Sequence, residues 1–223
     1  MDIPRVVVFD VNETLSDMSP LGRRFADVGA AESTAALWFA SLLRDAFALT
    51  AAGGTADFAT IGAAGLRSAF TGVPLTMDLD AAVGHVMSGF LALDVHPDVP
   101  DGVRALKRTG RRLVTLSNGS ASVAERLLTG AGLREEFEHL LSVEGAGVWK
   151  PAPGSYGYAA RVCGVDPSQM MLVAVHPWDI DGAARTGMAT TWINRDGLPY
   201  PEYFNPPTHT VTALTELPDR LTG

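Results

Sequence analysis

Arg5-Val-Val-Val-Phe9, followed directly by Asp10, is the stretch of sequence from which the fold can be worked out. An unbroken run of β-branched and aromatic residues is typical of a strand that is buried on both faces of a sheet. Open parallel sheets bind their ligands beyond the carboxyl ends of the strands. Asp10 is therefore the first candidate for a functional residue.

Short apolar segments recur downstream and alternate with segments of helical character. The strands are expected at 113–116, 140–143, 170–175, 189–193 and 210–212, and the helices at 103–109, 123–128, 154–162 and 180–186. Strands that alternate with helices predict a mainly parallel sheet flanked by helices on both faces, which is an α/β, Rossmann-like fold.

Residues 16–96 break this alternation. Apolar residues recur there at helical spacing within 32–52, 58–70 and 79–92, and glycine-containing breaks separate these segments. We therefore expect a helical cap domain, 16–96, inserted after the first strand of a core domain made of 1–15 and 97–223.

Composition narrows the class of protein. The 223 residues are 47% hydrophobic, which argues against a mostly disordered chain, and the net charge is −8. An acidic surface argues against nucleic acid or an anionic membrane as the main partner. The single cysteine, Cys163, excludes an intramolecular disulfide and a cysteine-based zinc site. No signal peptide or membrane span is evident, so a cytoplasmic location is expected.

Polar or charged residues follow several of the expected strands. Because the carboxyl ends of parallel strands share one edge of the sheet, these residues are expected to lie close together. They are Asp10, Ser117 with Asn118, Lys150, and His176 with Asp179.

The order and spacing of these residues resemble the haloacid dehalogenase superfamily along essentially the whole chain. Four segments carry the resemblance: Phe9-Asp-Val-Asn-Glu-Thr-Leu15, Thr115-Leu-Ser-Asn-Gly119, Trp149-Lys-Pro151 and His176-Pro-Trp-Asp-Ile-Asp-Gly-Ala183. In that superfamily an aspartate nucleophile follows the first strand, and a helical cap occupies the position of 16–96.

Two positions distinguish the branches of this superfamily. Its phosphatases carry a second aspartate where Asn12 stands, and an amide cannot act as acid and base. They also bind magnesium through carboxylates of the fourth segment, but Val175 occupies the earlier of those positions, and valine cannot bind a hard cation. No metal or other cofactor is therefore expected.

The remaining pattern resembles the 2-haloacid dehalogenases, in which an aspartate attacks the carbon bearing the halogen and water hydrolyses the resulting ester. Trp178-Asp179 and Tyr156 are typical of that branch. The resemblance implies a short anionic 2-haloalkanoic acid as the substrate, and a homodimer. The catalytic residues that it implies are Asp10 as nucleophile, Lys150 as its charge partner, Asp179 as water activator, and Thr14 and Ser117. The implied substrate contacts are Asn12, Asn118 at the halide, Tyr156, His176, Trp178 and Phe39.

Several positions depart from the dehalogenase pattern. Phe39 stands where those enzymes have an arginine that grips the halide, and Arg44 lies ~140° away around the expected helix. Ala174 and His176 replace a serine and an asparagine. A phosphatase or other hydrolase with an atypical site therefore stays open as an alternative, as does a binding protein of this fold with reduced catalysis.

Overall fold

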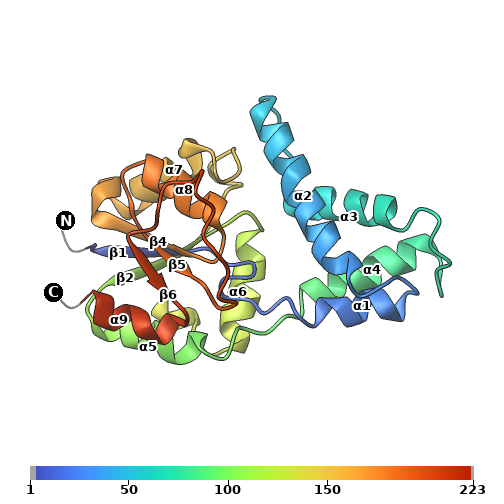
Figure 1. Cartoon of the computed structure of the whole chain (residues 1–223), viewed down its shortest axis with the longest axis horizontal. Helices are drawn as coiled ribbons and strands as arrows, with labels where there is room; N and C mark the ends of the chain where they lie inside the picture. Colours follow the sequence, from blue (N-terminus) through green and yellow to red (C-terminus); the bar gives the residue numbers. More distant parts are fainter. Residues whose placement is uncertain (1–3, 222–223) are drawn as a thin grey trace. The chain divides into compact units, whose positions relative to one another are not determined.

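The computed structural model describes residues 4–221, which form two compact units. One unit takes in Met1–Ser16 and Asp94–Gly223, as far as these are described, and the other is Asp17–Leu93. We call them the core unit and the inserted unit. The inserted unit lies between β1 and α5 in the chain and carries α1 to α4 (Figure 1).

The core unit is built on a parallel sheet with the strand order β3-β2-β1-β4-β5-β6. β1 lies between β2 and β4, and its first residue, Val6, pairs with Arg112 on one side and Met170 on the other. The strands are β1 Val6–Phe9, β2 Arg112–Ser117, β3 His139–Ser142, β4 Met170–Ala174, β5 Ala189–Ile193 and β6 His209–Val211. This arrangement confirms the predicted fold class.

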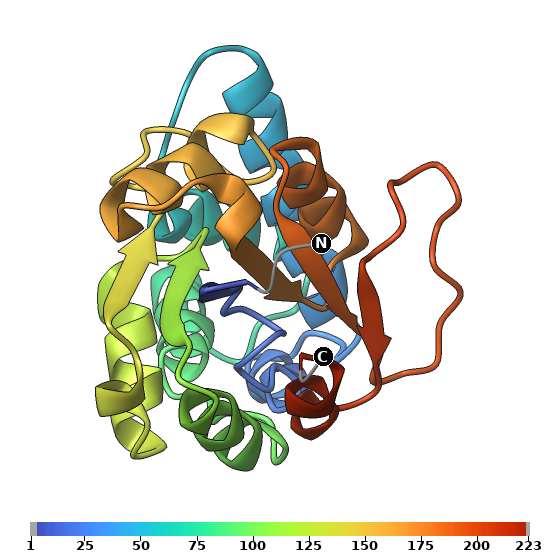
Figure 2. The same ribbon diagram turned by 90° about the vertical axis from the view of Figure 1, so that its left-hand side faces the viewer.

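Helices cover both faces of this sheet. α5, α6 and α9 lie on one face, and α7 and α8 lie on the other (Figures 1 and 2). Their bounds are α5 Val99–Arg108, α6 Ala121–Gly130, α7 Pro153–Cys163, α8 Pro177–Arg185 and α9 Leu217–Arg220, and short 3-10 helices span Arg134–Glu136, Pro167–Gln169 and Leu214–Glu216.

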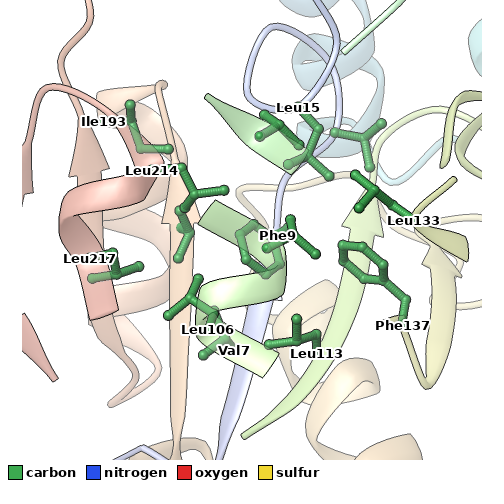
Figure 3. Packing of buried hydrophobic residues seen from close by; sticks show 14 of the residues in the cluster. Val7, Phe9, Leu15, Leu106, Leu113, Leu133, Phe137, Ile193, Leu214 and Leu217 are labelled. Atoms are coloured by element: carbon green, nitrogen blue, oxygen red, sulfur yellow. The ribbon is translucent and has the colours of Figure 1, made fainter. Parts of the chain in front are cut away.

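A buried apolar cluster joins the sheet to α5 and its neighbours. Val7 and Phe9, which point to the same face of β1, pack with Leu106 of α5 and with Leu113 and Phe137, as Figure 3 shows. The rings of Phe9 and Phe137 meet edge to face with centroids 5.7 Å apart. This packing fixes β1, and with it the position of the residue that follows.

α8 begins earlier than the sequence predicts. The sequence predicts this helix over 180–186. Proline fits the first turn of a helix, since its missing N–H has no partner there in any case. α8 therefore starts at Pro177, and Asp179 lies within its first turn.

The inserted unit is made of helices around an aromatic cluster. Trp38 is 1% exposed, lies with its ring near those of Phe25 and Phe90, and donates a hydrogen bond from Nε1 to the Gly62 carbonyl. The helices are α1 Leu21–Asp27, which the sequence reading did not identify, α2 Thr34–Ala51, α3 Phe58–Ala69 and α4 Leu79–Phe90. Among the described residues, no helix combines the length and apolar character that crossing a bilayer requires.

The boundary between the units lies slightly inside the expected range 16–96. Ser16 forms an isolated antiparallel bridge with Val95, and the His96 N–H donates to the Leu15 carbonyl. These contacts tie the two connecting segments to the core unit, so the inserted unit runs from Asp17 to Leu93.

Candidate active site

The carboxyl ends of four adjacent strands bring the candidate residues of the core unit together. Asp10 directly follows β1, Ser117 ends β2, and His176 lies between β4 and α8 as the N-cap residue of that helix. Lys150 lies in the loop between β3 and α7, and its backbone N–H donates to the Asn118 side chain at 2.9 Å. The edge of the sheet therefore gathers residues that are up to 166 positions apart in sequence.

Asp10 lies at the centre of this group and is 3% exposed. Its Oδ1 accepts a hydrogen bond from Lys150 Nζ at 2.8 Å. Its Oδ2 accepts from Thr14 Oγ1 at 2.7 Å and lies 3.0 Å from His176 Nδ1. Burial would raise the pKa of Asp10, but Lys150 and His176 outweigh it and hold that pKa well below its usual range. Asp10 is consequently an ionised carboxylate in a nearly water-free position.

Lys150 joins the two buried aspartates. Its side chain is completely buried, and Nζ donates to Asp10 Oδ1 and, at 2.5 Å, to Asp179 Oδ2. Burial would lower the pKa of Lys150, but the two carboxylates outweigh it and raise that pKa. A buried ammonium group is tolerated because its charge is paired and its donors are used.

Asp179 is completely buried, and its other carboxylate oxygen, Oδ1, accepts a hydrogen bond from the Tyr156 hydroxyl at 2.6 Å. Burial and the charge of Asp10 raise the pKa of Asp179 despite the opposing charge of Lys150. Gly182, one turn further along α8, allows this contact: a Cβ there would meet the Tyr156 hydroxyl and Pro151 at 2.6 Å.

The hydroxyl of Tyr156 has a partner within the site, and the expected contact of Tyr156 with the substrate stays a prediction. Its side chain is 0% exposed, and its hydroxyl is committed to Asp179 rather than to Asp10. Burial, followed by the charge of Asp179, raises the pKa of Tyr156 well above its usual value, so the hydroxyl keeps its proton. Tyr156 thus donates to Asp179 as a neutral hydroxyl group.

Asn118 holds the loop that carries Lys150. Its Oδ1 accepts from the Lys150 N–H at 2.9 Å, and its Nδ2 donates to the Lys150 carbonyl at 3.4 Å. These two bonds clamp the backbone of Lys150 against the end of β2. The expected contact of Asn118 with a halide stays a prediction.

Ser117 and Asn12 leave hydrogen-bonding groups free beside Asp10. Ser117 Oγ accepts from the Gly119 N–H at 2.9 Å, and within residues 4–221 its own proton has no acceptor. Asn12 is 5% exposed, and its side chain makes no hydrogen bond to any described residue. A Cβ on Gly119 would lie 3.3 Å from Ser117 Oγ and 3.7 Å from Asn12 Nδ2, so the two polar groups converge there.

His176 makes a contact that the sequence reading missed. Its Nε2 lies 2.7 Å from a carboxylate oxygen of Glu13, while Nδ1 faces Asp10. Burial would lower the pKa of His176, but the two carboxylates outweigh it and raise that pKa to about 9. The site therefore holds a second cation beside Lys150. Glu13 could have been singled out in the sequence as a charged residue within the segment from Phe9 to Leu15.

Trp178 forms one wall of this group. Its ring stacks on that of His176 with centroids 4.9 Å apart, and Lys150 Nζ lies 5.9 Å from its centroid. Both arrangements place an electron-rich face against a cation.

Phe39 belongs to the inserted unit and is 4% exposed. Its ring lies 6.5 Å from those of Trp38 and Phe58, centroid to centroid, within the aromatic cluster. A packing role accounts for a phenylalanine at this position, and its expected contact with the substrate stays a prediction.

Metal ligands are not grouped in the described part of the chain: no set of three or more histidine, cysteine, aspartate or glutamate side chains there has the arrangement that holds a metal ion.

Comparisons with known proteins agree with this geometry. A family model described as haloacid dehalogenase-like hydrolase matches residues 4–187. The chain is 34% identical to an (S)-2-haloacid dehalogenase of Pseudomonas sp. (strain YL), over 96% of this chain and 93% of that protein. It is 33% identical to (S)-2-haloacid dehalogenase 4A of Burkholderia cepacia, over 97% and 94%.

Solved structures of dehalogenases also resemble this chain. A dehalogenase whose crystal structure contains an intermediate complex is 30% identical and superposes with a TM-score of 0.92, covering 100% of this chain and 99% of that one. Fold, site geometry and sequence similarity over nearly the full length agree, and the chain belongs to the haloacid dehalogenase-like hydrolases.

Proposed function

We propose that this protein is a hydrolytic dehalogenase that acts on a short 2-haloalkanoic acid through an ester formed on Asp10. The observation that carries the proposal is the buried chain Asp10–Lys150–Asp179, in which one ammonium group joins two carboxylates. The names of the relatives point to the same substrate class and to its (S) enantiomer.

In the first step Asp10 displaces the halide. A lone pair of a carboxylate oxygen attacks the carbon that bears the halogen, and the carbon–halogen bond breaks with its electron pair leaving on the halide. Lys150 favours this step because it keeps Asp10 ionised and fixes its orientation. The products of the step are the aspartyl ester and a halide ion.

Asn12 and Ser117 are suited to bind the carboxylate of the substrate. Both are buried beside Gly119, and both have hydrogen-bond donors that no described residue uses. Two neutral donors suit a singly charged acid, because each buried donor left without an acceptor has an energetic cost that the substrate would remove.

In the second step water hydrolyses the ester. Water attacks the carboxyl carbon of Asp10, its proton passes to Asp179, and the bond between that carbon and the ester oxygen breaks. The departing alkoxide takes up a proton and leaves as the 2-hydroxy acid, and the oxygen from water stays on Asp10. The raised pKa of Asp179 favours proton uptake, and Tyr156 holds its carboxylate in place.

The residues present do not fit the magnesium ion that phosphatases of this superfamily use. Lys150 Nζ donates hydrogen bonds to both Asp10 and Asp179, so these carboxylates face an ammonium group that would repel a metal ion. Val175 offers no side-chain oxygen, and Asn12 cannot transfer a proton. A phosphatase is therefore the less favoured assignment.

Halide release tests the proposal. We expect the protein to release chloride from (S)-2-chloropropionate with a chelator present, faster than from the (R) enantiomer, and Asp10→Asn to abolish the release. Undiminished release by Asp10→Asn would contradict the mechanism. Magnesium-dependent release of phosphate from phosphate esters, without chloride release, would contradict the proposed substrate class.

A further inference from the structure

The two oxygens of Asp10 have different surroundings. A carboxylate oxygen has two lone-pair directions. Oδ2 is approached by two donors, Thr14 Oγ1 at 2.7 Å and His176 Nδ1 at 3.0 Å, whereas Oδ1 has one, Lys150 Nζ. Among the described residues, Oδ1 thus keeps a lone pair without a donor. The geometry makes Oδ1 the attacking atom and Oδ2 the carbonyl oxygen of the ester.

Thr14 and His176, the two donors to Oδ2, each have a second contact that fixes their position. The hydroxyl of Thr14 accepts a hydrogen bond from the Val175 N–H at 3.1 Å, so its own proton is directed at Oδ2. The imidazole of His176 is held on its far side by Glu13, 2.7 Å from Nε2, and its ring is stacked on Trp178. Such fixed donors stabilise charge that develops on an oxygen, because they need no reorganisation when it appears.

We propose that Thr14 and His176 form an oxyanion hole around Asp10 Oδ2, and that Glu13 keeps His176 protonated throughout the reaction. The proposal rests on the dehalogenase function proposed above. When water attacks the ester carbon, the carbonyl electrons move onto Oδ2, which becomes negatively charged. The oxyanion then collapses and expels Oδ1 with the product. His176 is a catalytic residue in this account, and Glu13 is a positioning residue.

Glu13 is a counterion of His176 that ester formation does not remove. Before the reaction, His176 has two carboxylate neighbours, Asp10 and Glu13. Esterification removes the charge of Asp10, so the imidazolium loses one of its two counterions just before it is needed. Glu13 is not consumed and stays 2.7 Å from Nε2. A carboxylate at this distance favours the charged imidazole, which can then donate to Oδ2 during hydrolysis.

The backbone at Glu13 supports a specific use of this side chain. Glu13 has φ 61°, and it is the one residue other than glycine with positive φ among residues 4–221. This conformation is uncommon for residues with a Cβ and is favourable for glycine. A glutamate at such a position suggests that its carboxylate has a use that offsets the conformational cost.

Rapid-quench kinetics separate the two steps. Excess (S)-2-chloropropionate is mixed with the wild-type protein, His176→Phe or Glu13→Gln, and chloride and the mass of the intact protein are followed from the first turnover onward. Phenylalanine keeps a ring that can stack on Trp178 but has no hydrogen-bond donor. His139→Phe is the matched control, since it removes a histidine that lies 3.4 Å from Glu138 at the amino end of β3 in the same unit.

We expect His176→Phe to release about one chloride per site in a first burst and then to turn over about 10²-fold more slowly, while the protein accumulates with the mass of the propionyl ester. Glu13→Gln, which keeps the size and polarity of the side chain, shows the same accumulation to a smaller extent. His139→Phe behaves like the wild type.

Two results would overturn the inference. One is a burst slowed as much as the steady state without ester accumulation, because His176 would then act only on the displacement. The other is wild-type behaviour of both site variants. Failure of the proposed function looks different: the wild-type protein itself would release no chloride, and the inference would fall with it.

Discussion

The core unit and the inserted unit use buried side chains in opposite ways. At the sheet edge of the core unit, Asp10, Lys150 and Asp179 are buried ionisable residues, and both aspartates accept hydrogen bonds from Lys150. In the inserted unit the buried centre is aromatic, with Trp38 surrounded by phenylalanine rings. Hydrophobic packing tolerates change better than a buried charge network, since removal of one charge leaves its partners unpaired.

The largest effect is expected for Lys150→Met. The change leaves two buried carboxylates without their common cation, so we expect a loss of about 3–5 kcal/mol of unfolding free energy at neutral pH together with the loss of activity. Denaturant unfolding at pH 7 measures the first quantity, and chloride release the second.

Lys107, the other lysine of the chain, provides the control. It lies in the last turn of α5, half-buried, and Lys107→Met is expected to change the unfolding free energy by less than about 0.5 kcal/mol. If the two variants were equally stable, the buried charge network would not be what distinguishes the core unit.

Trp38→Ala tests the inserted unit in the same way. Removal of this side chain, which is 1% exposed, leaves a cavity and removes one hydrogen bond to the Gly62 carbonyl, so we expect a loss of about 3–5 kcal/mol there. Hydrogen exchange measured by mass spectrometry should show faster exchange in α2 and α3, with unchanged protection in β1. Equal loss of protection in β1 would show that the two units unfold together.

The pH dependence of turnover tests whether the charged form of His176 takes part in the reaction. His176 is charged below its pKa of about 9, so the steady-state kcat, which includes ester hydrolysis, is expected to fall as the pH rises through about 9. Glu13→Gln removes one of the two carboxylates that raise this pKa and should move the fall to lower pH. A profile that is flat from pH 7 to 10 in both proteins would contradict a role for the charged imidazole.

A smaller effect is expected for Ser117→Ala. Loss of one hydrogen bond to the substrate carboxylate should lower kcat/KM about 10-fold, mainly through KM. The change also removes the acceptor of the Gly119 N–H, so the unfolding free energy should fall by about 1–3 kcal/mol. Ser122→Ala, an exposed residue on α6, is the control. An unchanged KM for Ser117→Ala would place the substrate carboxylate elsewhere.

The arrangement of the core unit could be predicted from the sequence, because strands buried on both faces have an unmistakable composition. The run from Val6 to Phe9 identified β1, and the residues after the strands identified Asp10 and Lys150. The start of α8 was misplaced because proline ends most helices but also begins them, as Pro177 does. Helix α1 was missed because seven residues are too few for a clear period.

The partners within the site could be predicted less well than its members. The resemblance implied Tyr156 but not that its hydroxyl meets Asp179, because Tyr156 and Asp179 lie 23 residues apart on different helices. The contact of Glu13 with His176 was not predicted, although Glu13 lies close to other site residues in the sequence. Glu13 has a positive φ, which its sequence neighbours do not indicate. Side-chain direction depends on backbone dihedrals that no spacing rule supplies.

The covalent role of Asp10 is the central claim, and one isotope experiment tests it most directly. The protein is allowed to turn over (S)-2-chloropropionate in ¹⁸O water, and the peptide that contains Asp10 is then analysed by mass spectrometry. The account predicts ¹⁸O in the Asp10 carboxylate, and product from a single turnover whose hydroxyl carries unlabelled oxygen. Label in the product hydroxyl after a single turnover, with none in Asp10, would contradict the ester mechanism.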